Sequence, residues 1–220
     1  MGQKTARVVA GQVVRDITVD GLTRLPSEAE LLKRYPVSRP TLREALRILE
    51  MYGVISLKTG PGGGAIVNAV ASYQFANSSS LYFHLLQLTL RDLMATRMRL
   101  EPFMARLAAE RVARGDLDEE GSLALQDGDV HVGIARLSGD PILLLVAQAL
   151  RDIFSDKSSM ERVRKDVSAN VTPPHELIEK AVRRGDAEDA ERLMHEHLTD
   201  YVAKLEQHYP NLLDEVIDWT

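Results

Sequence analysis

The chain has 220 residues, of which 45% are apolar and 27% are charged, proportions that are ordinary for a folded globular protein. It contains no cysteine, which excludes disulfide bonds and thiolate metal sites. It also has neither a continuous apolar stretch of about 18 residues for a membrane span nor the apolar core of a secretion signal near its start, so we expect a cytoplasmic protein with no membrane partner.

Charge is distributed unevenly along the chain. Residues 1–67 carry 10 Lys and Arg against 6 Asp and Glu, whereas residues 68–220 carry 17 against 26, and the net charge is −5. A basic part joined to an acidic part is the asymmetry expected when only the first part meets nucleic acid.

The first part of the chain begins with two predicted helices. Apolar residues at helical spacing indicate a helix over residues 5–17. Ser27 and Glu30 have the spacing of a capping box and predict the start of a second helix, which ends near Pro36.

A third helix and a hairpin follow. Ser38 can cap a helix over residues 39–51, since Pro40 falls in its first turn, where proline is tolerated. Residues 54–58 and 65–67 form two short apolar segments on either side of a glycine-rich tip, which indicates a hairpin. The order helix, helix, helix, hairpin predicts a winged helix-turn-helix.

A shift in composition between residues 59 and 80 places the domain boundary near residue 70. We therefore expect a winged helix-turn-helix DNA-binding domain over residues 1–70, a polar linker over 71–80 and an all-helical bundle over 81–220 for effector binding and dimerisation, in a mainly α fold. Within the bundle, apolar spacing predicts helices over the following ranges: 81–112, 127–138, 141–155, 175–184 and 187–207.

The third helix has the features of a DNA-recognition helix. Arg39, Arg43 and Arg47 are four residues apart and share one face, where arginine can pair with guanine or phosphate. This spacing alone also fits a solvated helix face, but the preceding turn, the hairpin and the basic charge balance favour DNA. The other candidate contacts lie at the helix start and in the hairpin: Ser38, Thr41, Lys58, Gly62, Gly63 and Gly64.

Four segments of this module resemble the GntR family of bacterial transcription regulators: Leu25–Glu28, Val37–Leu46, Leu49–Glu50 and Gly53–Ile55. The resemblance implies that Arg39 and Arg43 contact the operator. A third operator-contacting arginine of that family corresponds to Ala29 here, and Pro36 stands where a glycine is usual.

Four residues of the helical part form a candidate metal site: Asp127, His131, His175 and His197. Asp127 and His131 are four residues apart, on one face of the predicted helix. Imidazoles with one carboxylate suit zinc, nickel, manganese or iron. Scattered histidines are more often ordinary core or surface residues, so spacing alone leaves both interpretations open.

The helical part is also similar to the ligand-binding domain of the FadR subfamily of GntR regulators. The matching segments are Arg97–Glu101, Asp127–His131, His175–Ile178 and Met194–Leu198. The resemblance implies a divalent metal held by Asp127 and the three histidines, beside the carboxylate of an organic acid. It selects His197 over His195 as a metal ligand and makes Arg97 a candidate contact for the carboxylate of the acid. Asp129 is the alternative to Asp127 as the carboxylate ligand of the metal.

These features predict a ligand-responsive transcription regulator, by resemblance a repressor, that binds operator DNA as a homodimer and is modulated by a small carboxylate effector. Two alternatives are a metal-dependent enzyme and a metabolite binder that uses its winged helix for protein contacts. No nucleophile elbow, phosphate-binding loop or dinucleotide fingerprint supports an enzyme.

Overall fold

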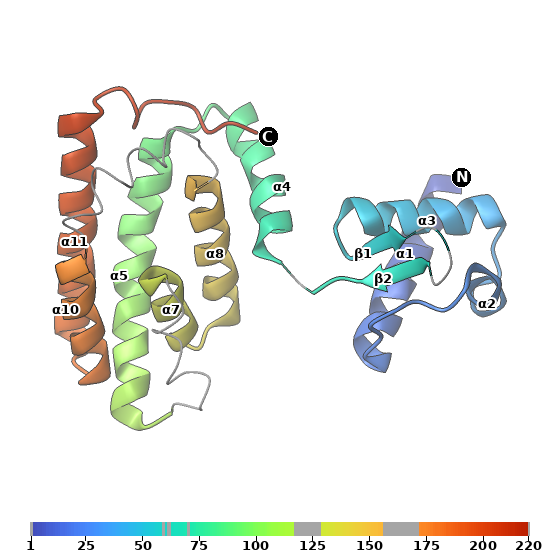
Figure 1. The fold of residues 1–220 in the computed structure, drawn as a ribbon, viewed down its shortest axis with the longest axis horizontal. Helices are drawn as coiled ribbons and strands as arrows, with labels where there is room; N and C mark the ends of the chain where they lie inside the picture. The colour runs from blue at the N-terminus through green and yellow to red at the C-terminus, as the bar shows by residue number, and fades with distance from the viewer. Residues whose placement is uncertain are drawn as a thin grey trace. The chain divides into compact units, whose positions relative to one another are not determined.

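A computed structural model describes residues 2–58, 60, 63–69, 71–116, 129–155 and 172–219. The chain divides into two compact units, residues 1–74 and 75–220, each with its own apolar core (Figure 1). The predicted fold class, a winged helix-turn-helix followed by an all-helical bundle, is confirmed. No helix in the described ranges combines the length and apolar character needed to cross a membrane.

The first unit contains three helices and a two-stranded antiparallel sheet: α1 (Gly2–Asp20), α2 (Glu28–Arg34), α3 (Arg39–Met51), β1 (Ile55–Lys58) and β2 (Gly64–Val67). Ile55 pairs with Val67 and Lys58 with Gly64, so the strands form the predicted hairpin. α1 packs on α3 through a shared apolar core.

Local hydrogen bonds explain where these helices begin. The Ser27 hydroxyl accepts a hydrogen bond from the Glu30 amide, and the Glu30 carboxylate accepts one from the Ser27 amide, which completes the predicted capping box. The Ser38 hydroxyl accepts from the Thr41 amide at the start of α3.

The second unit is built around α5 (Leu90–Arg114), which packs against four other helices: α7 (Val130–Leu137), α8 (Pro141–Ser155), α10 (Thr172–Arg183) and α11 (Ala187–His208). Figure 1 shows α10 and α11 side by side next to α5, with α7 and α8 on its other side. α11 makes the most extensive contact with α5, so these two helices form the central pair of the bundle.

The structure differs from the sequence-based expectation at residues 72–89. The segment expected as a polar linker forms most of α4 (Ser72–Leu85), and the predicted helix over 81–112 is interrupted before α5 begins. Serine does not prevent the helix, since the Ser80 hydroxyl donates to the carbonyl of Asn77 within the same turn. The interruption follows from Gln87, whose φ is 55°, and from a capping box between Thr89 and Asp92.

The last residues return to the connection between α4 and α5. The Ile217 amide donates to the Leu88 carbonyl, and Leu212, Leu213 and Ile217 are buried in the core. The chain end therefore holds the start of α5 in place.

Candidate metal centre and DNA interface

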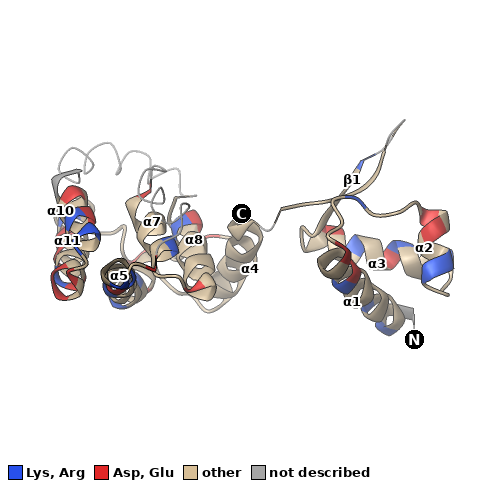
Figure 2. Cartoon of the chain, turned by 90° about the horizontal axis from the view of Figure 1, so that it is seen from below, with Lys and Arg blue, Asp and Glu red and all other residues tan. Residues whose placement is uncertain are grey.

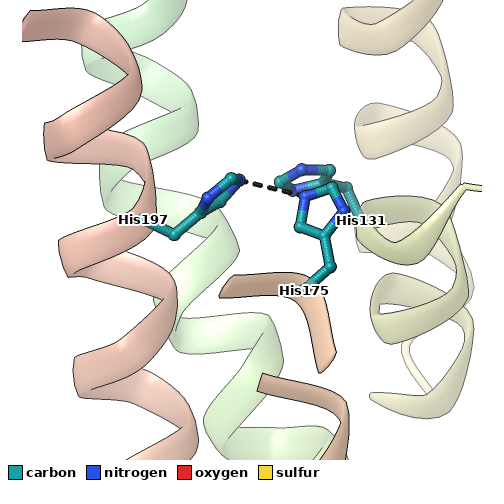
Figure 3. Close-up of side chains that lie close together, drawn as sticks. All are labelled: His131, His175 and His197. Carbon is teal, nitrogen blue, oxygen red and sulfur yellow. Dashed lines mark hydrogen bonds between the residues drawn. The ribbon is translucent and has the colours of Figure 1, made fainter. Parts of the chain in front are cut away.

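Three helices bring His131, His175 and His197 together. His131 projects from α7, His175 from α10 and His197 from α11, and their rings face one another in Figure 3. The Nε2 atoms of His175 and His197 are 3.1 Å apart, and the potential ligand atoms of all three lie within 4.8 Å of one another. Among the described residues, this is the one group with the composition and spacing of a metal site.

The packing of α10 against α11 fixes two of these histidines. Ile178, Ala181 and Val182 of α10 and Met194 and Leu198 of α11 are buried with less than about 2% of their surface exposed. His175 precedes Ile178 by less than one turn, and His197 lies between the two buried residues of α11, so both imidazoles point into the bundle.

A carboxylate of α5 holds the third histidine. Oε2 of Glu101 lies 2.6 Å from Nδ1 of His131, and both side chains are largely shielded from solvent. Because Nδ1 faces the carboxylate, Nε2 is the ring nitrogen left for a metal, as is usual when a second residue orients a ligating histidine. Sequence reasoning missed Glu101, although it stands in the Arg97–Glu101 segment singled out above.

The predicted effector contact, Arg97, is buried and forms an ion pair. Its Nε donates to Oε1 of Glu101 at 2.5 Å, and its guanidinium carbon lies 5.2 Å from the centre of the Phe154 ring. Arg97 is 7% exposed, so its ion pair with Glu101 is buried and does not lie on the surface. Its charge compensates the carboxylate beside the histidines.

The surroundings set the protonation of the cluster. Burial favours the neutral imidazoles, and the nearby His131 adds repulsion, so the pKa of His175 falls to about 4 and that of His197 to about 3. Burial alone would raise the pKa of Glu101, but the charge of Arg97 and then that of His131 outweigh it and lower the pKa below its usual range.

The donor set fits a divalent metal. Neutral His175 and His197 have lone pairs available at neutral pH, and His131 has an oriented ring. Nitrogen ligands about 2.1 Å from one ion are separated by roughly 3.0–3.4 Å, which matches the 3.1 Å between the two Nε2 atoms. Nitrogen donors favour zinc, nickel, iron or manganese over calcium.

The two candidate carboxylate ligands have different outcomes. Asp127 lies outside the described residues. Asp129 is the N-cap of α7, and its Oδ1 accepts hydrogen bonds from the amides of His131 and Val132. The helix expected over 127–138 therefore begins at Val130, later than predicted, because Asp129 caps it in an extended conformation.

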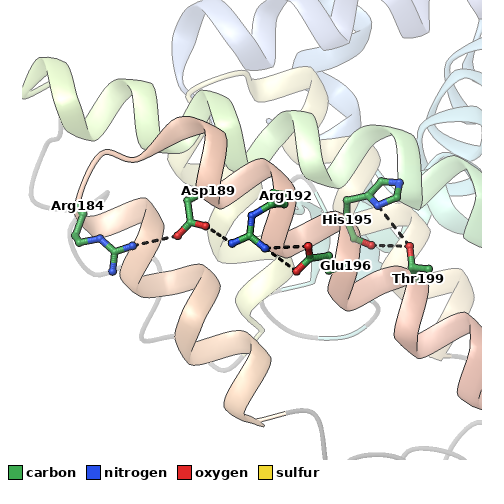
Figure 4. A network of polar contacts seen from close by, with 6 residues as sticks. All are labelled: Arg184, Asp189, Arg192, His195, Glu196 and Thr199. Carbon is green, nitrogen blue, oxygen red and sulfur yellow. Dashed lines mark hydrogen bonds and ion pairs between the residues drawn. The ribbon is translucent and has the colours of Figure 1, made fainter.

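His195 lies outside the cluster, on the exposed face of α11. Figure 4 shows it beside Thr199, in a row of polar side chains that also contains Arg184, Asp189, Arg192 and Glu196. The structure thus separates His195 from His197, two residues that sequence spacing alone cannot tell apart.

The predicted DNA-reading side chains lie on the exposed face of α3. Arg39, Arg43 and Arg47 are exposed, while Leu42, Ala45, Leu46 and Leu49 form another face, which is buried against the core of the first unit. Figure 2 marks the Lys and Arg positions of this unit in blue on the ribbon of α1, α2 and α3. The helix therefore combines a buried apolar face with an arginine-lined one.

The remaining candidate contacts lie at the ends of these elements. The hydroxyls of Ser38 and Thr41 are 2.8 Å apart at the start of α3. Lys58 is exposed at the end of β1, and Gly63 and Gly64 precede or begin β2. Gly62 lies outside the described residues.

Comparison with known proteins assigns both units. Residues 12–64 match the model of the bacterial regulatory proteins of the GntR family, and residues 92–200 match that of the FCD domain. The chain belongs to the GntR family of transcription regulators. The resemblance stated from the sequence, a GntR helix-turn-helix with a FadR-type helical domain, is therefore confirmed, and these families are regulators rather than enzymes.

Individual relatives agree with this assignment. The chain is 26% identical over 205 residues to the HTH-type transcriptional repressor NanR of Escherichia coli K12, covering 82% of this chain and 75% of that protein. It is 25% identical to NanR of Enterobacter sp. strain 638, covering 82% and 76%. A solved Streptococcus agalactiae GntR structure has a TM-score of 0.60 at 22% identity, covering 89% of this chain and 98% of that one, and it supports the fold.

Proposed function

We propose that this GntR-family regulator is a metal-containing, ligand-responsive repressor. In this proposal it binds operator DNA as a homodimer, and a small organic acid bound in its helical unit changes its affinity for DNA. The observation that carries the proposal is the group of three inward-facing histidines, with His131 oriented by Glu101.

His131, His175 and His197 would hold a divalent metal, with Asp127 as the proposed fourth protein ligand. A bound divalent ion supplies positive charge and open coordination positions, to which a carboxylate can bind. Glu101 fixes the ring of His131 and Arg97 balances the charge of Glu101. Arg97 remains our candidate for attracting the effector's carboxylate, because its guanidinium contacts Glu101, which in turn contacts His131.

The first unit would read DNA through α3. Arg39, Arg43 and Arg47 would enter the major groove, with phosphate contacts from Ser38 and Thr41 and a hairpin contact from Lys58, Gly62 and Gly63. A homodimer places two such helices about 34 Å apart, one turn of DNA, which suits a palindromic operator. Repression is supported by the names of the NanR relatives.

The effector can change DNA binding only if it binds one arrangement of the dimer more tightly than another. The three histidines lie on three different helices, α7, α10 and α11, which all pack on α5. A ligand bound to their metal would therefore be linked through the histidines to all three helices. This coupling makes the proposed site suitable for shifting the bundle between two arrangements.

The test of the metal site is the metal content of the protein. Elemental analysis of the purified full-length protein should find about one divalent ion per chain, and His175→Ala combined with His197→Ala should remove it. His195→Ala is the matched control, because this exposed histidine lies on the same helix and should leave the metal in place. Metal retained in full by the double variant contradicts the site.

A further inference from the structure

A single carboxylate contacts both of the leading arginines of the recognition helix. Oε2 of Glu28, the first residue of α2, lies 3.3 Å from Nε of Arg43, and its Oε1 lies 4.0 Å from Nη1 of Arg39. The two arginines are exposed, with 72% and 67% of their side chains accessible, whereas Glu28 is about half as accessible at 34%. The carboxylate is therefore less accessible to solvent than the two guanidinium groups beside it.

The Oε1 atom of Glu28 is shielded from solvent, and within the described part of the chain it accepts no hydrogen bond. A buried carboxylate oxygen without a donor is unfavourable unless a positive charge lies close by. The guanidinium of Arg39 is that charge. The position of Glu28 is thus better explained by the two arginines than by the capping of α2, which Ser27 and Glu30 complete between themselves.

The contact with Arg43 leaves the base-reading edge of its side chain available. Because Glu28 engages Nε, it does not occupy Nη1 and Nη2, the pair of nitrogens that can bind O6 and N7 of guanine together. A guanidinium held at Nε also has a restricted plane, so less rotational freedom is lost when it meets a base.

The same carboxylate reduces the attraction of this face for phosphate. Sequence-independent binding grows with the number of positive charges that neutralise phosphates, and Glu28 offsets one of the two charges of Arg39 and Arg43. A carboxylate in this position favours contacts that depend on arginine geometry over contacts that depend only on charge.

We propose that Glu28 is a positioning residue for operator recognition, which orients Arg43 and Arg39 for base contacts and suppresses binding to unrelated DNA. This inference rests on the proposed function of α3 in reading DNA. It predicts that removal of the carboxylate changes specificity, which is the ratio of operator affinity to non-specific affinity, rather than affinity alone.

The experiment uses full-length protein and two duplexes of equal length. One is selected by the unmodified protein from a randomised pool, and the other is a scrambled version of it. Dissociation constants are measured by fluorescence anisotropy at several salt concentrations for the unmodified protein, Glu28→Gln and Glu44→Gln. Glu44 is the matched control, since it is an exposed glutamate of α3 that carries the same charge.

We expect Glu28→Gln to bind the scrambled duplex more tightly. The slope of log affinity against log salt concentration should be steeper by up to about 0.9, the contribution of one additional phosphate contact. The specificity ratio should fall by roughly fivefold or more, part of the discrimination that one arginine–guanine pair provides. Glu44→Gln should change the ratio less. An unchanged ratio in Glu28→Gln, or equal effects of the two variants, overturns the inference.

Glu28→Asp separates orientation from charge and guards against a folding defect. It keeps an acidic residue in the first turn of α2, but its carboxylate is one methylene too short to reach Arg43 in the same position. The specificity ratio should fall without a steeper salt slope, and a ratio equal to that of the unmodified protein contradicts positioning. If the unmodified protein selects no sequence from the pool, it is the proposed function that fails.

Discussion

Nδ1 of His131 lies 2.6 Å from Oε2 of Glu101, and the other oxygen of that carboxylate accepts a hydrogen bond from Arg97. The arrangement joins three residues of the second unit into a chain from arginine to carboxylate to imidazole. Glu101 therefore orients His131, a proposed metal ligand, without being a proposed metal ligand itself.

Glu101→Gln should therefore weaken metal binding without abolishing it. The amide keeps the size of the side chain but lacks the charge that favours a donating Nδ1–H on His131, and substitutions of this kind lower metal affinity by about 10- to 100-fold. Competition with a chelator of known affinity measures the change. Glu110→Gln, at a partly exposed glutamate of the same helix, is the control. Equal metal affinity in the two variants would mean that the contact has no role in binding.

Replacing the arginines of α3 should affect DNA binding and leave the fold intact. Arg39→Ala and Arg43→Ala should each weaken operator binding by roughly 5- to 100-fold, the contribution of one bidentate contact to a base. Both side chains are exposed, so we expect unchanged helicity by circular dichroism. Arg15→Ala, at an exposed position of α1, removes the same charge from the same unit and should have a smaller effect. A gel-shift titration that gives either variant the affinity of the unmodified protein would exclude that arginine from the interface.

Much of the first unit could be predicted from the sequence because its signals are local. Capping by Ser27 and Ser38 depends on residues three positions away, and the apolar face of α3 follows from helical spacing. The interruption before α5 was missed because apolar spacing continues through it, whereas the capping pair Thr89 and Asp92 ends that continuity.

Residue types and the family resemblance selected the three histidines, but not the geometry of the site. Histidines at positions 131, 175 and 197 suggest metal binding, but their convergence depends on how α7, α10 and α11 pack on α5. The roles proposed for Glu28 and Glu101 rest on contacts with Arg43 and His131, which are 15 and 30 residues away in the chain, and no local pattern encodes such distances.

Without metal, the protein should lose stability as the pH falls from about 6.5 toward 4. Burial, and then repulsion from His131, depress the pKa values of His175 and His197 to about 4 and about 3, although Glu101 acts in the opposite direction. Over this range both histidines take up protons in the unfolded chain, where their pKa values are near 6.5, while the folded bundle keeps them neutral. Acid therefore favours the unfolded chain.

Thermal melts of the chelator-treated protein from pH 7.5 to 4.5 measure this dependence. The double variant His175→Ala and His197→Ala should show a shallower decline, since titration of the other groups is common to both proteins. Parallel declines would show that these histidines are not protected from protons in the folded state.

The end of α3 offers a test of how the recognition helix is held. Gly53 has a φ of 68°, its amide donates to the Glu50 carbonyl, and the Val54 amide donates to the Leu49 carbonyl, the hydrogen-bond pattern of a Schellman motif. A Cβ at position 53 would also lie 2.2 Å from the side-chain amide nitrogen of Gln74. Gly53→Ala should therefore lower the free energy of unfolding of the first unit by about 1–2 kcal/mol, through left-handed strain together with displacement of Gln74.

Two other glycines of the same unit serve as matched controls. Gly21 has a φ of 61° and open space around it, so Gly21→Ala adds the backbone strain alone and should cost less than Gly53→Ala. Gly11 lies inside α1, and a Cβ added there would meet no atom of another element within 4 Å, so Gly11→Ala should stabilise the helix by about 0.5–1 kcal/mol. Urea titration followed by circular dichroism should rank the stabilities as Gly11→Ala, then Gly21→Ala, then Gly53→Ala. Equal losses of stability in Gly21→Ala and Gly53→Ala would mean that Gln74 moves aside without cost. The left-handed backbone conformation alone would then account for the effect at position 53.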